Sequence, residues 1–87
     1  MFAGKLIASD AVELIRSAVK NGRRVLGVDG FRVVPEGFVA SLDLILDLSV
    51  RPTPMLVAAT AAIQFVTSHA ADDVVFEVVV EDRASGG

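Results

Sequence analysis

The order of hydrophobic and polar positions divides the chain into segments with the periodicity of helices or strands. Over residues 10–21, hydrophobic side chains recur at intervals of three and four and form one apolar face. Asp10 is placed to cap this helix, and Glu13 completes a capping box with it. Gly22 follows and favours the left-handed backbone that ends a helix. We therefore predict a helix over residues 10–21.

Two runs of β-forming residues, 24–28 and 31–34, flank the dipeptide formed by Asp29 and Gly30. Asp-Gly between two such runs is a hairpin signal, because both turn residues must accept a positive φ. We therefore predict a hairpin that turns at this dipeptide. Gly27 interrupts the first run, which predicts a bulge or a close approach of another backbone segment.

Hydrophobic and acidic residues alternate over residues 42–48, as expected for a strand with one buried side. One side carries Leu42, Leu44, Leu46 and Leu48. The other side carries Asp43, Ile45 and Asp47. We predict a strand here, while a helix that begins at Phe38 remains the alternative.

The longest uncharged stretch covers residues 52–71, where Thr53 and Pro54 predict the cap and the first position of a second helix. Prolines and polar residues interrupt the stretch, so we expect a buried helix that ends at Ser68 or His69, not a membrane span. A helix without a charge over this length has no evident solvent face. We therefore predict an oligomer interface on it, formed by Leu56, Val57, Ile63, Phe65 and Val66.

Residues 74–80 are hydrophobic on both sides except at Glu77, which predicts a central strand. We expect residues 83–87 to form a disordered tail. The order helix, hairpin, strand, helix, strand predicts a single compact α/β domain over residues 1–82. Its expected class is α+β, with two helices packed on one face of a small mixed sheet of three or four strands.

The composition points to contact with another chain. The 87 residues include no cysteine and one histidine, so one subunit lacks the residues for a disulfide framework or a cysteine- or histidine-rich metal site. Hydrophobic residues make up 53% of the chain, and the mean hydropathy is +0.61. Because a domain of this size has little interior, we expect a homo-oligomer such as a homodimer, or a protein partner, to cover part of this surface.

The net charge of −3 argues against nucleic acid as a partner. The charge is also uneven, because residues 35–87 carry two basic residues against eight acidic ones. An acidic surface speeds the encounter with a basic partner. The candidate partner-binding residues are Asp43, Asp47, Asp72, Asp73 and Glu77.

No arrangement of residues points to catalysis. The only histidine, His69, lies near the expected end of the second helix, where its positive form suits the helix dipole. No serine stands in a Gly-x-Ser-x-Gly elbow, and the segment from Gly27 to Gly30 lacks the Lys-Ser/Thr ending of a phosphate loop. We expect no enzyme activity, no catalytic residue, no cofactor and no metal site.

Three segments carry a resemblance to a known family: Val25-Leu26-Gly27-Val28-Asp29-Gly30-Phe31, Leu46-Asp47-Leu48-Ser49 and Val75-Phe76-Glu77-Val78-Val79. Together they resemble a pattern in small bacterial immunity proteins of polymorphic-toxin systems. The resemblance implies a non-catalytic protein that neutralises a toxin by tight binding through an acidic surface.

The alternative function is that of a homo-oligomeric structural or regulatory domain, with the charge-free second helix buried between subunits. In either case we expect a cytoplasmic protein, because the apolar residues before Ser9 are too few for the core of a signal peptide.

Overall fold

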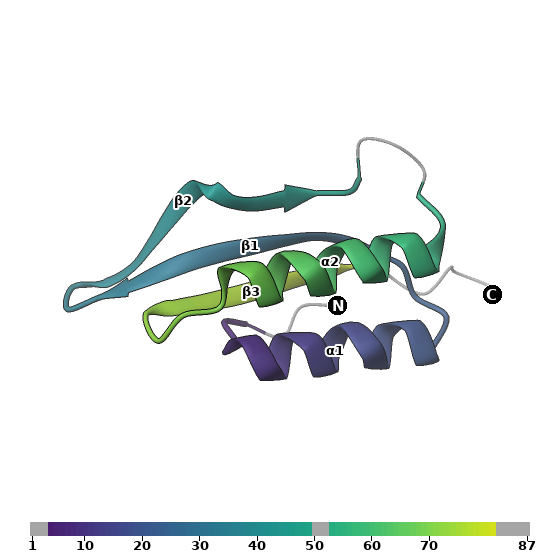
Figure 1. Cartoon of the computed structure of the whole chain (residues 1–87), viewed down its shortest axis with the longest axis horizontal. Coiled ribbons are helices and arrows are strands. Elements are labelled where there is room, and N and C mark those ends of the chain that lie inside the picture. The colour runs from purple at the N-terminus through teal and green to yellow at the C-terminus, as the bar shows by residue number, and fades with distance from the viewer. Residues whose placement is uncertain (1–3, 50–52, 82–87) are drawn as a thin grey trace.

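The computed structural model describes residues 4–49 and 53–81, which form two helices packed on one face of a three-stranded sheet (Figure 1). The elements in chain order are α1 (Ala8–Lys20), β1 (Val25–Val34), β2 (Gly37–Asp47), α2 (Met55–His69) and β3 (Val74–Val80). The α+β class and the packing of both helices on the sheet are confirmed. The tail expected over residues 83–87 lies outside the described residues.

The sheet is antiparallel with the order β2-β1-β3, so the expectation of a mixed sheet is wrong. β1 and β2 form a hairpin, and α2 then carries the chain back along the sheet before β3 begins. β2 and β3 therefore run in the same direction, but β1 lies between them and pairs antiparallel with both. The same order shows that β1 is the central strand, which corrects the prediction that residues 74–80 are central.

One side of β3 faces the helices, and the other side belongs to a sheet surface that no described helix covers. The side that faces the helices carries the buried residues Val74, Phe76, Val78 and Val80. At the outer edge of β3, Leu6 and Phe76 exchange two backbone hydrogen bonds, each with an N–O distance of 2.7 Å. This bridge covers part of the edge and fixes the chain that leads into α1.

Both helices begin without the predicted side-chain caps. Ile7 occupies the N-cap position of α1, and Asp10 lies inside the first turn, so the capping box is wrong. The bridge at Leu6 determines where the chain leaves the sheet, and the helix starts directly after it. Pro54 is the N-cap of α2, and no side-chain hydrogen bond caps this helix, so the prediction for Thr53 is also wrong.

The predicted C-terminal ends of the two helices are confirmed, that of α1 to within one residue. α1 ends at Lys20, and Gly22 has a φ of +70°, in the left-handed region that glycine adopts without strain. The side-chain amide of Asn21 donates a hydrogen bond to the backbone oxygen of Ser17 at 2.8 Å, which satisfies a carbonyl of the last turn. α2 ends at His69.

The predicted hairpin turn at Asp29 and Gly30 is wrong. β1 continues through both residues, and neither is among the described residues with a positive φ. The chain turns instead at Pro35 and Glu36, directly before Gly37, which has a φ of +137°. The pairing of β1 with a strand on each side keeps the Asp-Gly dipeptide extended and overrides its local preference for a turn.

Two glycines of β1 allow β2 to lie close to it. A Cβ added at Gly30 would lie 2.7 Å from the Cβ of Leu44, and one added at Gly27 would lie 2.8 Å from the backbone oxygen of Leu46. The pairing of β1 with β3 also shifts in register between Val25 and Gly27. The predicted bulge or close backbone approach at Gly27 is therefore confirmed.

β2 is a strand, as predicted, and the helical alternative is wrong. Leu44 is buried, and Leu46 and Leu48 are half-buried against the core. Leu42 departs from the predicted pattern and is 90% exposed. The departure arises because the register of β2 against β1 is irregular on either side of Gly30.

One hydrophobic core joins the helices to the sheet. α1 packs on β3 and α2, and α2 packs on β1 and β2. α2 contributes mainly alanines to this core, which allow the helix to lie close to the strands. The core residues are Ala11, Ile15, Ala18, Val25, Val28, Leu44, Ala59, Ala62, Val66, Val74, Phe76, Val78 and Val80.

Gly30→Ala should destabilise the fold, because the new Cβ would overlap the side chain of Leu44. We expect the free energy of unfolding to fall by about 1–3 kcal/mol, as for an overpacked core. Urea denaturation followed by circular dichroism measures this change. An unchanged denaturation midpoint would contradict the close approach of β2 to β1 at this position.

Candidate functional site

The face of the sheet opposite the helices carries hydrophobic side chains that no described helix covers. Side chains alternate between faces along a strand, so the neighbours of the buried positions project from this side. This surface is termed the open face, and its hydrophobic residues are Phe31, Val33, Phe38, Ile45, Val75 and Val79. Phe38 is 55% exposed and Ile45 is 43% exposed. Exposed hydrophobic side chains gathered on one face are typical of an interaction surface.

Lys5 places a cation on the open face. Its Nζ lies 3.1 Å from Oε1 of Glu77. The same ammonium group lies 4.8 Å from the ring centroid of Phe31 and 5.0 Å from that of Phe38. The ion pair and the two cation–π contacts hold Lys5 in place. Glu77 is therefore already paired within the chain.

Asp29 is half-buried, and none of the described cations forms a salt bridge with its carboxylate. In the sheet it lies opposite Glu77 of β3 and Ile45 of β2. Within residues 4–49 and 53–81, no hydrogen bond or salt bridge reaches its carboxylate. Burial raises the pKa of Asp29 above its ordinary value, and the negative charges of Glu77 and Asp47 raise it further. The free chain thus holds this carboxylate where its charge is unfavourable.

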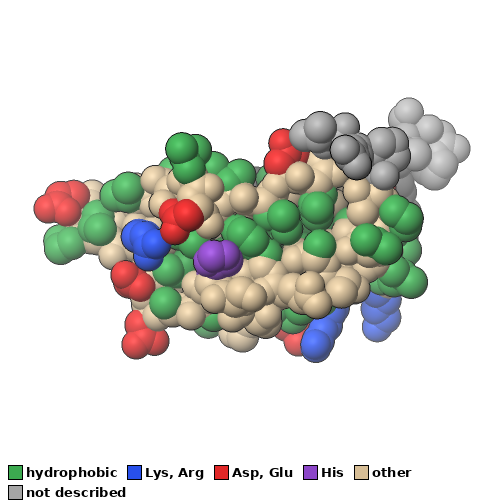
Figure 2. Space-filling model, turned by 45° about the horizontal axis from the view of Figure 1, so that its top comes forward, with side chains coloured by type: hydrophobic (Ala, Val, Ile, Leu, Met, Phe, Trp, Pro, Cys, Tyr) green, Lys and Arg blue, Asp and Glu red, His purple; other side chains and the backbone are tan. Residues whose placement is uncertain are grey.

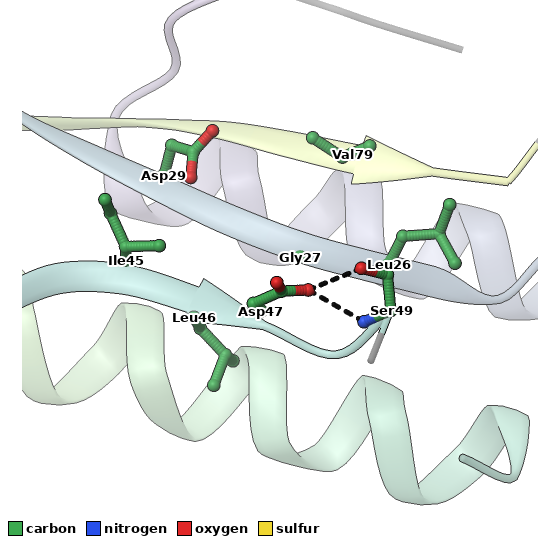
Figure 3. A pocket seen from close by; sticks show the side chains of 8 residues that line it. All are labelled: Leu26, Gly27, Asp29, Ile45, Leu46, Asp47, Ser49 and Val79. Atoms are coloured by element: carbon green, nitrogen blue, oxygen red, sulfur yellow. Dashed lines mark hydrogen bonds between the residues drawn. The ribbon is translucent and has the colours of Figure 1, made fainter. Parts of the chain in front are cut away.

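Asp47, at the end of β2, is stabilised in its charged form. Its Oδ1 accepts hydrogen bonds from the backbone nitrogen of Ser49 at 2.9 Å and from the Ser49 hydroxyl at 2.6 Å (Figure 3). These bonds lower the pKa of Asp47 below its ordinary value, against a smaller opposing effect of desolvation. Two carboxylates in one part of the sheet therefore have pKa shifts of opposite sign.

An open hollow of about 290 Å³ lies between these two carboxylates on the sheet surface. All three strands contribute to its lining, as Figure 3 shows. The lining residues are Leu26, Gly27, Asp29, Ile45, Leu46, Asp47, Ser49 and Val79. The open face therefore combines a hydrophobic surface with an acidic hollow.

The structure divides the acidic residues predicted to bind a partner. Asp47 and Glu77 lie on the open face near Asp29. Asp43 forms a salt bridge of 3.3 Å with an arginine of β1 instead. Asp72 and Asp73 are exposed in the turn between α2 and β3 and take no part in this group.

Sequence reasoning assigns Asp29 to a turn and therefore misses it as a site residue. The signal that finds it is strand alternation. If residues 25–34 are taken as one strand, Val28 faces the core and Asp29 must face the opposite side.

The predicted oligomer interface on α2 is divided between the core and the surface. Val66 is fully buried in the chain's own core, and Ile63 and Phe65 pack against that core half-buried. Leu56 and Val57 are 65% and 57% exposed. Figure 2 shows hydrophobic side chains extending to the right of the histidine that ends α2. Of the five predicted residues, Leu56 and Val57 thus offer the largest surface to another chain.

The remaining polar groups form no recognisable reactive centre in the part of the chain that the structure describes. His69 lies against Phe65 with 4.6 Å between the ring centroids, which is a packing contact at the end of α2. The described residues contain no group of three or more histidine, cysteine or acidic residues that could hold a metal ion. None of the described helices has the length and hydrophobicity needed to cross a membrane.

No protein-family model matches this sequence, and a search of curated proteins gives no match.

Asp29→Asn should stabilise the free chain at neutral pH. Like charges directly opposite each other in a sheet cost about 0.2–1 kcal/mol, and this change removes the charge opposite Glu77. Because the folded-state pKa of Asp29 is raised, the cost is present above that pKa and is relieved as the pH falls through it towards 3.8. The gain in unfolding free energy, measured by urea denaturation, should shrink as the pH is lowered from about 7 to about 4.

Asp47→Asn is the matched change and should have the opposite effect. The folded-state pKa of Asp47 is lowered, so its ionised form contributes stability above 3.8 that is lost as the pH falls through the lowered pKa. We expect the variant to be less stable than the parent chain at neutral pH in the same denaturation experiment. Stability changes of the same sign in both variants would contradict the different surroundings of the two carboxylates.

Proposed function

We propose that this chain is a non-catalytic protein-binding domain that binds a basic protein through its open face. One observation supports the proposal above all others. The sheet surface that the helices leave uncovered combines exposed hydrophobic side chains with Asp29, a carboxylate that pairs with no cation of residues 4–49 and 53–81. Hydrophobic contacts supply affinity at protein interfaces, and complementary charge speeds and orients the encounter.

The charges of the open face favour a basic partner over a second copy of the chain. Lys5 is set there against the carboxylates of Asp29, Asp47 and Glu77. Two copies that meet through their open faces would bring six carboxylates but only two ammonium groups into the interface. A nucleic acid would add its phosphate charges to the same side. A protein that presents cations among hydrophobic residues would instead offset the excess negative charge.

The basic partner is a toxin, as for the small bacterial immunity proteins that the sequence resembles. The support is spatial, because the three segments that carry the resemblance come from β1, from the end of β2 and from β3. Seven of the eight residues that line the acidic hollow belong to these segments. An inhibitor of this kind needs no reactive group, because it acts by covering a surface of the toxin.

The experiment pairs the chain with the protein encoded immediately upstream. We expect that protein alone to arrest growth and co-expression of this chain to restore it, with a stable complex on size-exclusion chromatography. The double variant Ile45→Thr/Val79→Thr removes exposed hydrophobic surface but keeps β-branched side chains. Isothermal titration calorimetry should show that this variant binds the upstream protein at least about tenfold more weakly than the parent chain does.

Leu56→Gln is the matched control, because it removes an exposed hydrophobic residue from α2 and leaves the open face intact. Its affinity for the upstream protein should stay within about twofold of the parent chain, as for residues outside an interface. An upstream protein that neither affects growth nor binds would contradict the inhibitory function. Unchanged affinity of the double variant would show that the open face is not the binding surface.

A homo-oligomeric structural or regulatory domain is the second candidate, supported by the outer surface of α2. Leu56 and Val57 line a shallow hollow of about 350 Å³ together with Thr60, Ala61 and Gln64. None of these residues carries a charge, so two copies of α2 can meet without electrostatic repulsion.

This second candidate predicts a dimer in sedimentation equilibrium at chain concentrations of about 10–100 µM, and Leu56→Gln should dissociate it. The Ile45→Thr/Val79→Thr variant should leave the dimer intact, because its changes lie on the other side of the sheet. A monomeric mass at every concentration would exclude this interface.

A further inference from the structure

We propose that the hollow on the open face binds an arginine side chain that projects from the partner protein. This inference rests on the proposed function, since the arginine belongs to the protein that covers the open face. The arginine side chain would anchor the partner, and the residues of the hollow would bind it.

The hollow lies beside Gly27 of the central strand. Gly27 pairs with Asp47 of β2 on one side and with Val79 of β3 on the other. Gly27 adds no side chain to the lining of the hollow, and the backbone oxygen of Leu46 lies 2.8 Å from the place that a Cβ would take. Leu26 and Ile45 complete the hydrophobic part of the lining. The three methylene groups of an arginine would lie against this lining while the charged end reaches the carboxylates.

The two carboxylates are spaced for a guanidinium group. Asp29 pairs with Ile45, and Gly27 pairs with Asp47, so the two aspartates are diagonal neighbours on adjacent strands. Such positions are about 7–8 Å apart, so one group that lies between the two side chains can reach both carboxylates. A guanidinium group has five N–H donors on different edges and can bond to both carboxylates at once.

Both carboxylates have oxygens free to accept these bonds. Both hydrogen bonds from Ser49 go to Oδ1 of Asp47, which leaves Oδ2 available. The Asp29 carboxylate has no bonding partner among the described residues. Lys5 is held 3.1 Å from Glu77 and does not fill the hollow. The raised pKa of Asp29 agrees with this assignment, because an incoming cation would offset the repulsion that raises it.

Arginine fits this site better than lysine. The guanidinium group is planar and weakly hydrated, so it loses less solvation than an ammonium group when it lies on hydrophobic side chains. The walls formed by Ile45 and Val79 are of this kind. A buried arginine near the middle of an interface is also a frequent source of binding energy.

The test uses n-butylguanidinium, which reproduces the arginine side chain, and n-butylurea, a neutral molecule of similar shape. Each is titrated into the ¹⁵N-labelled full chain at neutral pH and low salt while amide chemical shifts are recorded. We expect saturable shifts at Gly27, Asp29 and Val79 with n-butylguanidinium, with a Kd on the order of 10 mM. Binding of n-butylurea should be about fivefold weaker or undetectable.

Asp29→Asn should weaken n-butylguanidinium binding about fivefold, because it removes one of the two charged acceptors. Glu13→Gln is the matched control, since it removes a carboxylate from the exposed surface of α1 and lowers the negative charge equally. Amide spectra and thermal midpoints verify that both variants fold. The inference is overturned if the parent chain binds both probes equally or neither, or if Asp29→Asn binds n-butylguanidinium unchanged.

Failure of this inference differs from failure of the proposed function. Suppose that Ile45→Thr/Val79→Thr no longer binds the upstream protein, while the parent chain binds n-butylguanidinium and n-butylurea equally. The open face then binds its partner without an arginine anchor. Only the inference is then overturned. If the double variant retains full affinity for the upstream protein, the proposed function and the inference both fail.

Discussion

Both helices pack on the same face of the three-stranded sheet and on each other, and this arrangement leaves the other face without a helix among the described residues. On the covered face, α2 packs on β1 and β2 while α1 packs on β3, and Val28, Phe76 and Val78 are buried. On the other face, strand alternation still places hydrophobic residues such as Ile45 and Val79, now exposed. The chain thus presents a hydrophobic sheet surface of the kind that contacts another molecule.

Local signals in the sequence could predict most elements but not the way in which they join. The stop at Gly22 and the strand that contains Leu44 depend on near neighbours in the chain, and both predictions are confirmed. The turn expected at Asp29 and Gly30 fails because β1 is paired on both sides, and Gly30 instead makes room for Leu44. Strand order depends on contacts between distant segments, which periodicity does not report.

The candidate site could be predicted only in part, for the same reason. Acidic composition pointed to Asp47 and Glu77, which do lie on the open face. The importance of Asp29 arises from its position opposite Glu77, and the register of β1 against β3 sets that position. The absence of charge in α2 likewise did not show which side is buried, and the structure places Val66 in the core and Leu56 at the surface.

The most direct measurement is methyl cross-saturation in the complex between this chain and the protein encoded upstream. The chain carries labelled isoleucine, leucine and valine methyl groups, and saturation is applied to the unlabelled partner. The account predicts that the methyl signals of Ile45 and Val79 lose intensity while those of Leu56 and Val57 do not. Loss confined to Leu56 and Val57 would contradict it and would place the partner on α2.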